Sequence, residues 1–363
     1  MNTIEPERWE TGSEFHWWLP EKLSASSGWL PTGELFGSGR DALRMLILHG
    51  IANRQWKRLW LPSYFCQEVV AALLSSSIHI ESYADSPLNP TPTPPSDLQP
   101  GDAILLVNFF GLRSRPPLVE FLQQQQIEVI EDHTHDLGST WAQNSQADWG
   151  VASLRKTLPI PDGGILWSPR GYAVPSTSTV TAKRQIASLQ KLVGMLLKTL
   201  YLLNYPVTKE RFRSLFISGE TAIADGEISR MTAWTQSLLA TFPMDEWRSM
   251  RAANHTILVA GLRQIPWVQI LEPKNAQESC PFSGILLFDT PERRDFVYQQ
   301  LLIARIYPAI LWPLTPSTPY SRPEDVNFSH RMLSMHCDMR YTATDMQKIA
   351  DFIRAFGEAY YIK

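Results

Sequence analysis

Residues 153–164 read S-L-R-K-T-L-P-I-P-D-G-G and lie between two apolar segments, each of which is predicted to form a β-strand. The Gly-Gly pair at the end of the stretch allows the backbone to turn sharply into the second strand. Upstream, an apolar strand over residues 128–131 leads directly to Asp132. The sequence therefore predicts a sheet with Lys156 and Asp132 at the ends of two of its strands.

Strand and helix signals alternate through the first half of the chain. Helices are predicted over residues 39–49, 67–74 and 117–125, and strands over residues 58–62, 78–83, 103–108, 128–131, 149–153 and 165–168. Such alternation is typical of an α/β fold, with a mainly parallel sheet covered by helices on both faces. In such sheets, functional groups gather at the carboxyl ends of the strands.

The pattern changes after Gly171, where helical periodicity dominates as far as Leu262. The remainder is predicted to be a smaller α+β domain, with elements at residues 284–288, 291–302 and 343–356. We expect a large domain over residues 1–235 and a small C-terminal domain over residues 236–363. Within the first, residues 1–35 are rich in aromatic side chains and are predicted to form an arm that packs on the body or on a partner subunit.

Composition limits the classes of partner. The chain has 363 residues, of which 44% are hydrophobic, and a formal net charge of −3 that gives no field for attracting nucleic acid or acidic lipid. Its three cysteines form no C-x-x-C motif, which is typical of a reduced, cytoplasmic protein. Residues 186–203 are apolar but interrupted by Gln190, Lys191 and Lys198, so they predict a buried or interface helix and not a membrane span.

Lys156, Asp132 and Ser153 together suggest a cofactor site. A lysine amine can form an imine, a carboxylate can hold a protonated pyridine nitrogen, and a hydroxyl can bind phosphate, as pyridoxal 5'-phosphate (PLP) requires. Burial beside a cofactor would lower the pKa of the amine enough for it to attack a carbonyl. Each residue also has a simpler interpretation, because Lys156 can be a solvated loop residue and Asp132 a helix N-cap.

Further candidates surround this set. Residues 37–43 are predicted to form a glycine turn that leads into a helix, where backbone N–H groups around Ser38 and Gly39 can bind a phosphate; the alternative is that Ser38 only caps the helix. Tyr64 or Phe65, at the end of another strand, can stack on the pyridine ring, and core packing is the alternative for each. Alternation along the chain places His135, rather than His133, nearer the ring; with no third ligand nearby, the pair predicts no metal site.

These motifs, in this order, resemble the DegT/DnrJ/EryC1/StrS family of sugar aminotransferases. The resemblance is strongest in residues 37–43, 61–66, 107–111, 130–138 and 153–164. It implies the fold-type-I PLP-dependent transferase architecture, a three-layer α/β/α large domain with a smaller C-terminal domain. It also implies that Lys156 is the Schiff-base lysine, Asp132 the pyridinium partner, Ser153 a phosphate ligand, and Ser38 and Gly39 the start of the phosphate cup.

Three positions depart from the family pattern. His135 replaces a glutamine beside the phenolic oxygen of the cofactor, and imidazole can donate the same hydrogen bond. Arg40 replaces a small hydroxyl residue in the phosphate cup, where it adds a cationic contact or points away. Ser229 replaces an asparagine that reaches the phosphate from the partner subunit in this family. These changes suggest a divergent branch, which leaves open whether the acceptor is the family's usual nucleotide sugar.

The resemblance implies a homodimeric aminotransferase with a shared active site and a ping-pong cycle. Its amino donor is expected to be glutamate, and its acceptor a keto group on a nucleotide-linked or otherwise activated sugar. Lys156 would move the proton as general base and acid. Arg340 can pair bidentately with the donor carboxylate, or it can be an ordinary surface arginine.

Alternative functions share the same residues. Another fold-type-I activity, such as decarboxylation or elimination, would use the same lysine and acid. A catalytically silent PLP-binding regulator would explain the departures at Arg40 and Ser229, although such a protein has no need of a reactive amine. In the simplest alternative, the chain is an α/β protein without a cofactor.

Overall fold

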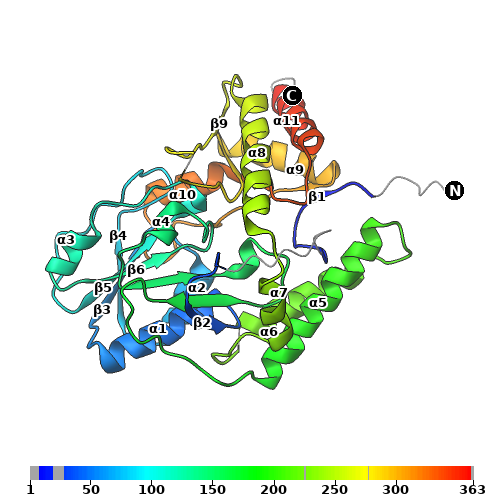
Figure 1. The fold of residues 1–363 in the computed structure, drawn as a ribbon. Coiled ribbons are helices and arrows are strands. Elements are labelled where there is room, and N and C mark those ends of the chain that lie inside the picture. Colours follow the sequence, from blue (N-terminus) through cyan, green and yellow to red (C-terminus); the bar gives the residue numbers. More distant parts are fainter. Residues whose placement is uncertain (1–7, 19–27, 225, 277, 361–363) are drawn as a thin grey trace.

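A seven-stranded sheet forms the centre of the computed structural model, which describes residues 8–18, 28–224, 226–276 and 278–360 (Figure 1). The strands lie in the order β2, β8, β7, β6, β5, β3, β4. Strands β4, β3, β5, β6 and β7 are parallel, whereas β8 is antiparallel to both of its neighbours. Their bounds are β2 (Gly33–Phe36), β3 (Arg58–Pro62), β4 (His79–Tyr83), β5 (Asp102–Val107), β6 (Glu128–Asp132), β7 (Trp149–Ala152) and β8 (Gly164–Trp167).

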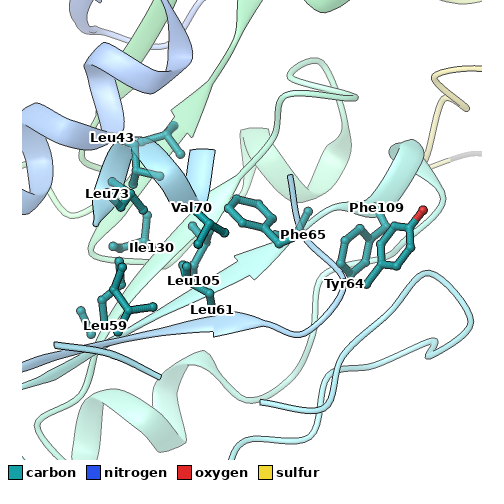
Figure 2. Packing of buried hydrophobic residues seen from close by; sticks show 14 of the residues in the cluster. Leu43, Leu59, Leu61, Tyr64, Phe65, Val70, Leu73, Leu105, Phe109 and Ile130 are labelled. Atoms are coloured by element: carbon teal, nitrogen blue, oxygen red, sulfur yellow. The ribbon is translucent and has the colours of Figure 1, made fainter. Parts of the chain in front are cut away.

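Alternate side chains of the strands pack on helices on opposite faces of the sheet. On one face, residues such as Leu105 pack with α1 and α2, as Figure 2 shows for part of this cluster. On the other face, residues such as Ile104 pack with α3 and α4. These helices are α1 (Gly39–Asn53), α2 (Gln67–Leu73), α3 (Val119–Gln124) and α4 (Thr140–Gln143). The large domain therefore has the predicted three layers.

One edge of the sheet collects the candidate site residues. Strand β6 ends at Asp132, and Ser153 follows the last residue of β7. Because β8 runs in the opposite direction, its first residue, Gly164, lies at this same edge, where it pairs with Phe36 at the end of β2. The turn that follows β2 therefore lies beside the connection between β7 and β8.

Two long helices, α5 (Ala182–Leu202) and α6 (Lys209–Ala224), pack against each other beside the sheet (Figure 1). Their backbones approach closely, since a Cβ atom on Gly219 would lie 2.6 Å from Lys191 and 3.0 Å from the carbonyl oxygen of Ala187. Helix α5 corresponds to the apolar stretch that the sequence predicts to be a buried or interface helix. Among the described residues, no helix has the length and apolar character needed to cross a membrane.

The N-terminal segment packs on the body of the same chain where it is described. Its short strand β1 (Thr11–Gly12) pairs in parallel with β11 (Ile306–Tyr307), and the Trp9 indole N–H donates a hydrogen bond of 2.7 Å to Asp345. Residues 33–36, which the sequence places in the arm, instead form the strand β2 at the edge of the large sheet. Four residues are too few to give a clear period-two signal.

The C-terminal part contains a second sheet, antiparallel and three-stranded, in the order β12, β10, β9. Its apolar core joins this sheet to α8, α9 and α11. The remaining elements are α7 (Ala233–Leu239), α8 (Met244–Leu262), β9 (Val268–Ile270), β10 (Gly284–Phe288), α9 (Pro291–Ile303), α10 (Pro323–Arg331), β12 (Met332–Met335), α11 (Ala343–Ala359) and the single turns η1 (Phe109–Gly111) and η2 (Leu154–Lys156). In the sequence, the strands of the seven-stranded sheet precede residue 235 and those of the three-stranded sheet follow it. The domain boundary at residue 235 stays a prediction.

Candidate active site

A cavity of about 1020 Å³ opens at the edge of the large sheet where the strand ends meet. Its wall includes nine of the residues that the sequence singles out, namely Ser38, Gly39, Arg40, Phe65, Asp132, His135, Ser153, Lys156 and Arg340. Residues 13–15, residues of α5, α6 and α8, and several residues between positions 282 and 340 also line the wall. The structure thus brings together residues that are far apart in the sequence, while Tyr64 and Ser229 lie outside the wall.

Three glycines allow the segments of the site to approach one another. A Cβ atom on Gly39 would lie 2.8 Å from the Cβ of Ser153, and one on Gly164 would lie 2.3 Å from the backbone of Ser38. Gly163 has a φ of +143° and donates its N–H to the carbonyl of Gly37 at 2.8 Å. The glycine turn after β2 can therefore contact the turn that carries the lysine only because side chains are missing at these positions.

Lys156 is the last residue of the short helical turn η2 and is exposed to the cavity. Its backbone N–H donates to the carbonyl of Ser153 at 3.3 Å. The amine lies close enough to two other wall residues for its charge to act on them: it contributes to lowering the pKa of His135 and opposes the effect of burial on the pKa of Cys66. The Lys156 side chain is therefore exposed to the cavity, and its burial beside a bound cofactor stays a prediction.

Asp132 is held in a fixed position by the residue two places after it. The backbone N–H of Thr134 donates to Asp132 Oδ1 at 2.8 Å, and the Thr134 hydroxyl accepts a hydrogen bond of 3.0 Å from the backbone N–H of Ser153. Burial raises the pKa of Asp132, and the hydrogen bond from Thr134 opposes this rise. The hydrogen bonds of the described residues leave Oδ2 without a partner, so this oxygen can accept a hydrogen bond from a cationic N–H group in the cavity.

His135 is a neutral imidazole, and one of its ring nitrogens already accepts a hydrogen bond. The backbone N–H of Phe110 donates to His135 Nδ1 at 3.1 Å, which places the ring proton on Nε2. Burial lowers the pKa of His135 to about 3, and the charges of Lys156 and Arg251 act in the same direction. The ring stacks on Phe110 and on Trp312, with centroid distances of 5.4 and 6.1 Å. His135 therefore offers a fixed N–H donor.

His133 lies outside the cavity wall. It is fully buried, its Nε2 lies 3.0 Å from Glu131 Oε2, and its ring packs edge-on against Trp141. Among the described residues, no group of three or more histidine, cysteine, aspartate or glutamate side chains is placed to hold a metal ion.

Cations cluster beside the N-terminus of α1. Glu220 of α6 forms ion pairs with Arg155 at 2.6 Å, Lys191 at 2.7 Å and Arg40 at 3.2 Å. Although burial opposes the change, Arg155 and Lys191 hold the pKa of Glu220 well below its usual range. Arg40 also lies 3.6 Å from Glu68, and Lys191 lies 3.7 Å from Glu14, so the cluster combines cations and carboxylates next to a helix end that itself attracts anions. The Ser38 hydroxyl accepts from the N–H of Asp41 at 3.1 Å, so it caps the helix.

Tyr64 and Phe65 have separate environments. Tyr64 is fully buried, its hydroxyl donates to the carbonyl of Leu311, and its ring packs edge-on against Phe109, as Figure 2 shows. Phe65 lines the cavity and packs against Trp312 at a centroid distance of 6.1 Å. Of these two candidates for stacking on a ring, Phe65 is the one that reaches the cavity.

Ser229 and Arg340 already have partners within the chain. The Ser229 hydroxyl donates to the carbonyl of Arg230 at 3.0 Å, so its contact with a phosphate in a partner subunit stays a prediction. The Arg340 side chain is only 2% exposed and binds Asp338 through two hydrogen bonds of 2.7 and 2.8 Å. Arg340 is thus not a surface arginine, but its bidentate face is occupied.

Several wall residues carry no signal in the sequence. Arg155, Lys191, Glu220 and Arg251 belong to segments that read only as a turn or as helices. Their roles depend on which charged side chains the fold brings into contact, and tertiary contacts between distant segments decide this. Thr134 is an intermediate case, because it lies between two residues that the sequence does single out.

Solved structures share this architecture, although no protein-family model and no curated protein sequence matches the chain. DesI, in the presence of its TDP-sugar product, matches with a TM-score of 0.58 at 16% identity over 90% of this chain and 81% of that one. The aminotransferase TlmJ from Streptoalloteichus hindustanus gives 0.57 at 15% identity over 91% and 86%. The PLP form of Spr1654 from Streptococcus pneumoniae gives 0.63 at 12% identity over 97% and 93%. The chain has the fold-type-I architecture.

Because native His135 stays neutral, the free energy of unfolding is expected to depend on pH through it. Below pH 6.5 the unfolded chain takes up a proton that the native residue does not take up until about pH 3, so stability falls as the pH falls through this window. In chemical denaturation between roughly pH 6 and pH 4, the free energy of unfolding of wild type should fall by about 1.4 kcal/mol per pH unit more than that of His135→Gln. The exposed His79→Gln variant should follow wild type, and equal slopes for wild type and His135→Gln would contradict the assignment.

Proposed function

We propose that this chain is a PLP-dependent aminotransferase. One observation carries the proposal: a lysine amine, a carboxylate with a free oxygen and a neutral N–H donor line one cavity, with Arg40, Arg155 and the N-terminus of α1 at one end. This set matches the parts of the cofactor one by one. The shared fold with an aminotransferase and with a PLP-form protein supports the proposal.

The residues fit the cofactor at both ends. At the ring, Asp132 Oδ2 would accept from the pyridinium nitrogen, and the His135 Nε2–H would donate to the phenolic oxygen. At the phosphate, the first turn of α1 leaves N–H groups without intrahelical partners, and Arg40 and Arg155 supply positive charge. Ser153 lies against Gly39 and can donate its hydroxyl to the same group.

When bound, PLP would supply an aldehyde for covalent attachment and a ring that withdraws electrons from the substrate Cα. Asp132 keeps its negative charge most readily when a pyridinium is its partner, which offsets the rise of its pKa on burial. Lys156 is the base in reach, and its exposure to the cavity lets it take a proton from Cα and return it. His135, held neutral, donates without giving up its proton.

The substrates fit a ping-pong transfer between an amino acid and a keto sugar. The cavity volume of about 1020 Å³ is at the upper limit of ordinary ligand sites and leaves room beside the cofactor for a large acceptor. DesI, whose structure shares this fold, was solved in the presence of a TDP-sugar product. We propose glutamate as donor and an activated keto sugar as acceptor.

The assembly that we propose is a homodimer joined at α5. Six apolar side chains of this helix and its end form one exposed stripe at alternating spacings of three and four residues: Ile186, Leu189, Val193, Leu196, Leu200 and Leu203. Stripes with this spacing pack against a second helix, and a two-fold axis brings the same stripe from another copy. Lys191 and Met195 of this helix line the cavity, so the interface would border the site.

A charge placed in the stripe should separate the subunits. Leu196, 41% exposed, changed to glutamate would place a carboxylate against its counterpart across the two-fold axis. Light scattering after size-exclusion chromatography should give twice the chain mass for wild type and for the loop variant Leu88→Glu, and one chain mass for Leu196→Glu. A wild-type monomer, or an Leu196→Glu dimer, would contradict this interface.

We also propose that the protein works in the cytoplasm. Its three cysteines, Cys66, Cys280 and Cys337, are free thiols, and two of them are buried in the fold. Free thiols of this kind are usual in reducing compartments.

The function is tested by the visible spectrum of the purified protein with added PLP. Wild type and Lys57→Ala, which changes an exposed lysine at the opposite edge of the sheet, should show a yellow band that is lost in Lys156→Ala. Added glutamate should bleach the wild-type band and release one 2-oxoglutarate per site without carbon dioxide. Release of carbon dioxide would indicate decarboxylation, and a band unchanged by any amino acid would indicate a silent binder.

A further inference from the structure

Arg251 is a buried cation without a partner in the part of the chain that the structure describes. It lies on α8, is 3% exposed, and makes no ion pair or hydrogen bond with any described residue. Its Nε atom is inaccessible to solvent and lacks an acceptor. A buried charge with neither counter-ion nor hydrogen bonds is costly, so proteins rarely keep one without a use.

Two buried aspartates that contact α8, Asp136 and Asp338, are already bound by other arginines. Asp136 accepts from Arg248 at 3.1 and 3.3 Å, and from the backbone N–H of Cys280 at 2.9 Å. Asp338 is bound on both oxygens by Arg340. Arg248 and Arg340 thus bind these acids directly, whereas Arg251 acts on Asp136 only through its charge, which opposes the rise in the pKa of that carboxyl on burial.

The position of Arg251 indicates where its counter-ion would come from. The residue lines the same cavity as Lys156 and His135. Its charge contributes, after burial and Lys156, to lowering the pKa of His135, which places the guanidinium near that ring. Of the three guanidinium nitrogens, only Nε is a buried atom without a hydrogen-bond partner. The two Nη atoms are therefore the part of the side chain that faces the cavity.

We propose that Arg251 binds the carboxylate of the amino donor. This inference rests on the proposed aminotransferase function and assigns its donor class: an amino acid whose carboxylate enters the small-domain side of the cavity. The planar guanidinium matches a carboxylate in size and geometry, and the two charges satisfy each other away from water. The guanidinium of Arg340, which the sequence suggests for this role, is already paired with Asp338, and that suggestion stays a prediction.

Binding of a carboxylate is measured by calorimetry with glutarate, which has no amino group to react. Wild-type protein, as purified and loaded with PLP, should bind glutarate, and Arg251→Met should bind it on the order of 10–100-fold more weakly because it loses charge-assisted hydrogen bonds. Arg263→Met, which removes the same charge just beyond the same helix, should bind as wild type does. Unchanged affinity in Arg251→Met, or no binding by wild type, would overturn the proposal.

Thermal unfolding separates this role from a structural one. Replacing an uncompensated buried charge with an apolar side chain should leave the unfolding temperature of Arg251→Met without ligand equal to or above that of wild type. A lower unfolding temperature would assign Arg251 to the architecture and overturn the proposal. If wild type shows no visible band with PLP yet binds glutarate through Arg251, the aminotransferase function fails while the carboxylate site stands.

Discussion

The close approach of three backbone segments is the constraint on which the site depends. The turn after β2, the turn that carries Lys156 and the first residue of β8 meet where Gly39, Gly163 and Gly164 leave no room for side chains. This contact places the N-terminus of α1 beside the lysine turn. Because β8 is antiparallel to β7, it begins at the functional edge where β7 ends, and the lysine turn joins the two strands at that edge.

Charge is distributed along the cavity in a way that suits one kind of ligand. Cationic side chains lie beside α1, where Arg40, Arg155 and Lys191 surround Glu220. A carboxylate with a free oxygen lies at the sheet edge, and the neutral imidazole of His135 lies beyond it. The unpaired cation Arg251 lies in the part of the wall that α8 contributes. A phosphate, a protonated ring and a substrate carboxylate would each meet the charge or dipole that it needs.

The sequence predicts helices and strands correctly where the signal is local. Strand β3 covers residues 58–62 and α9 begins at Pro291, both as periodicity predicts. It failed where the outcome depends on contacts between distant segments. The strand β2 is too short to show a period, and nothing in residues 244–262 indicates that Arg248 would find an acid while Arg251 would not.

The same distinction holds for the site. The order of the motifs along the chain singles out Lys156, Asp132 and Ser153 as site candidates, because each of them lies at or just after the end of a predicted strand. The choice between Tyr64 and Phe65 could not be made, since it depends on how the chain leaves β3; the structure places Phe65 in the wall and buries Tyr64. Arg340 could not be judged either, because its partner Asp338 is two residues away and either could have faced the cavity.

The central claim is that the Lys156 amine is the attachment point for PLP, and chemical trapping tests it most directly. Borohydride converts a reversible imine into a stable secondary amine, which peptide mass mapping can then locate. The account predicts a phosphopyridoxyl group on the peptide that contains Lys156 and on no other lysine. An unmodified Lys156, or a label on a different lysine of the same wall such as Lys191, would contradict it.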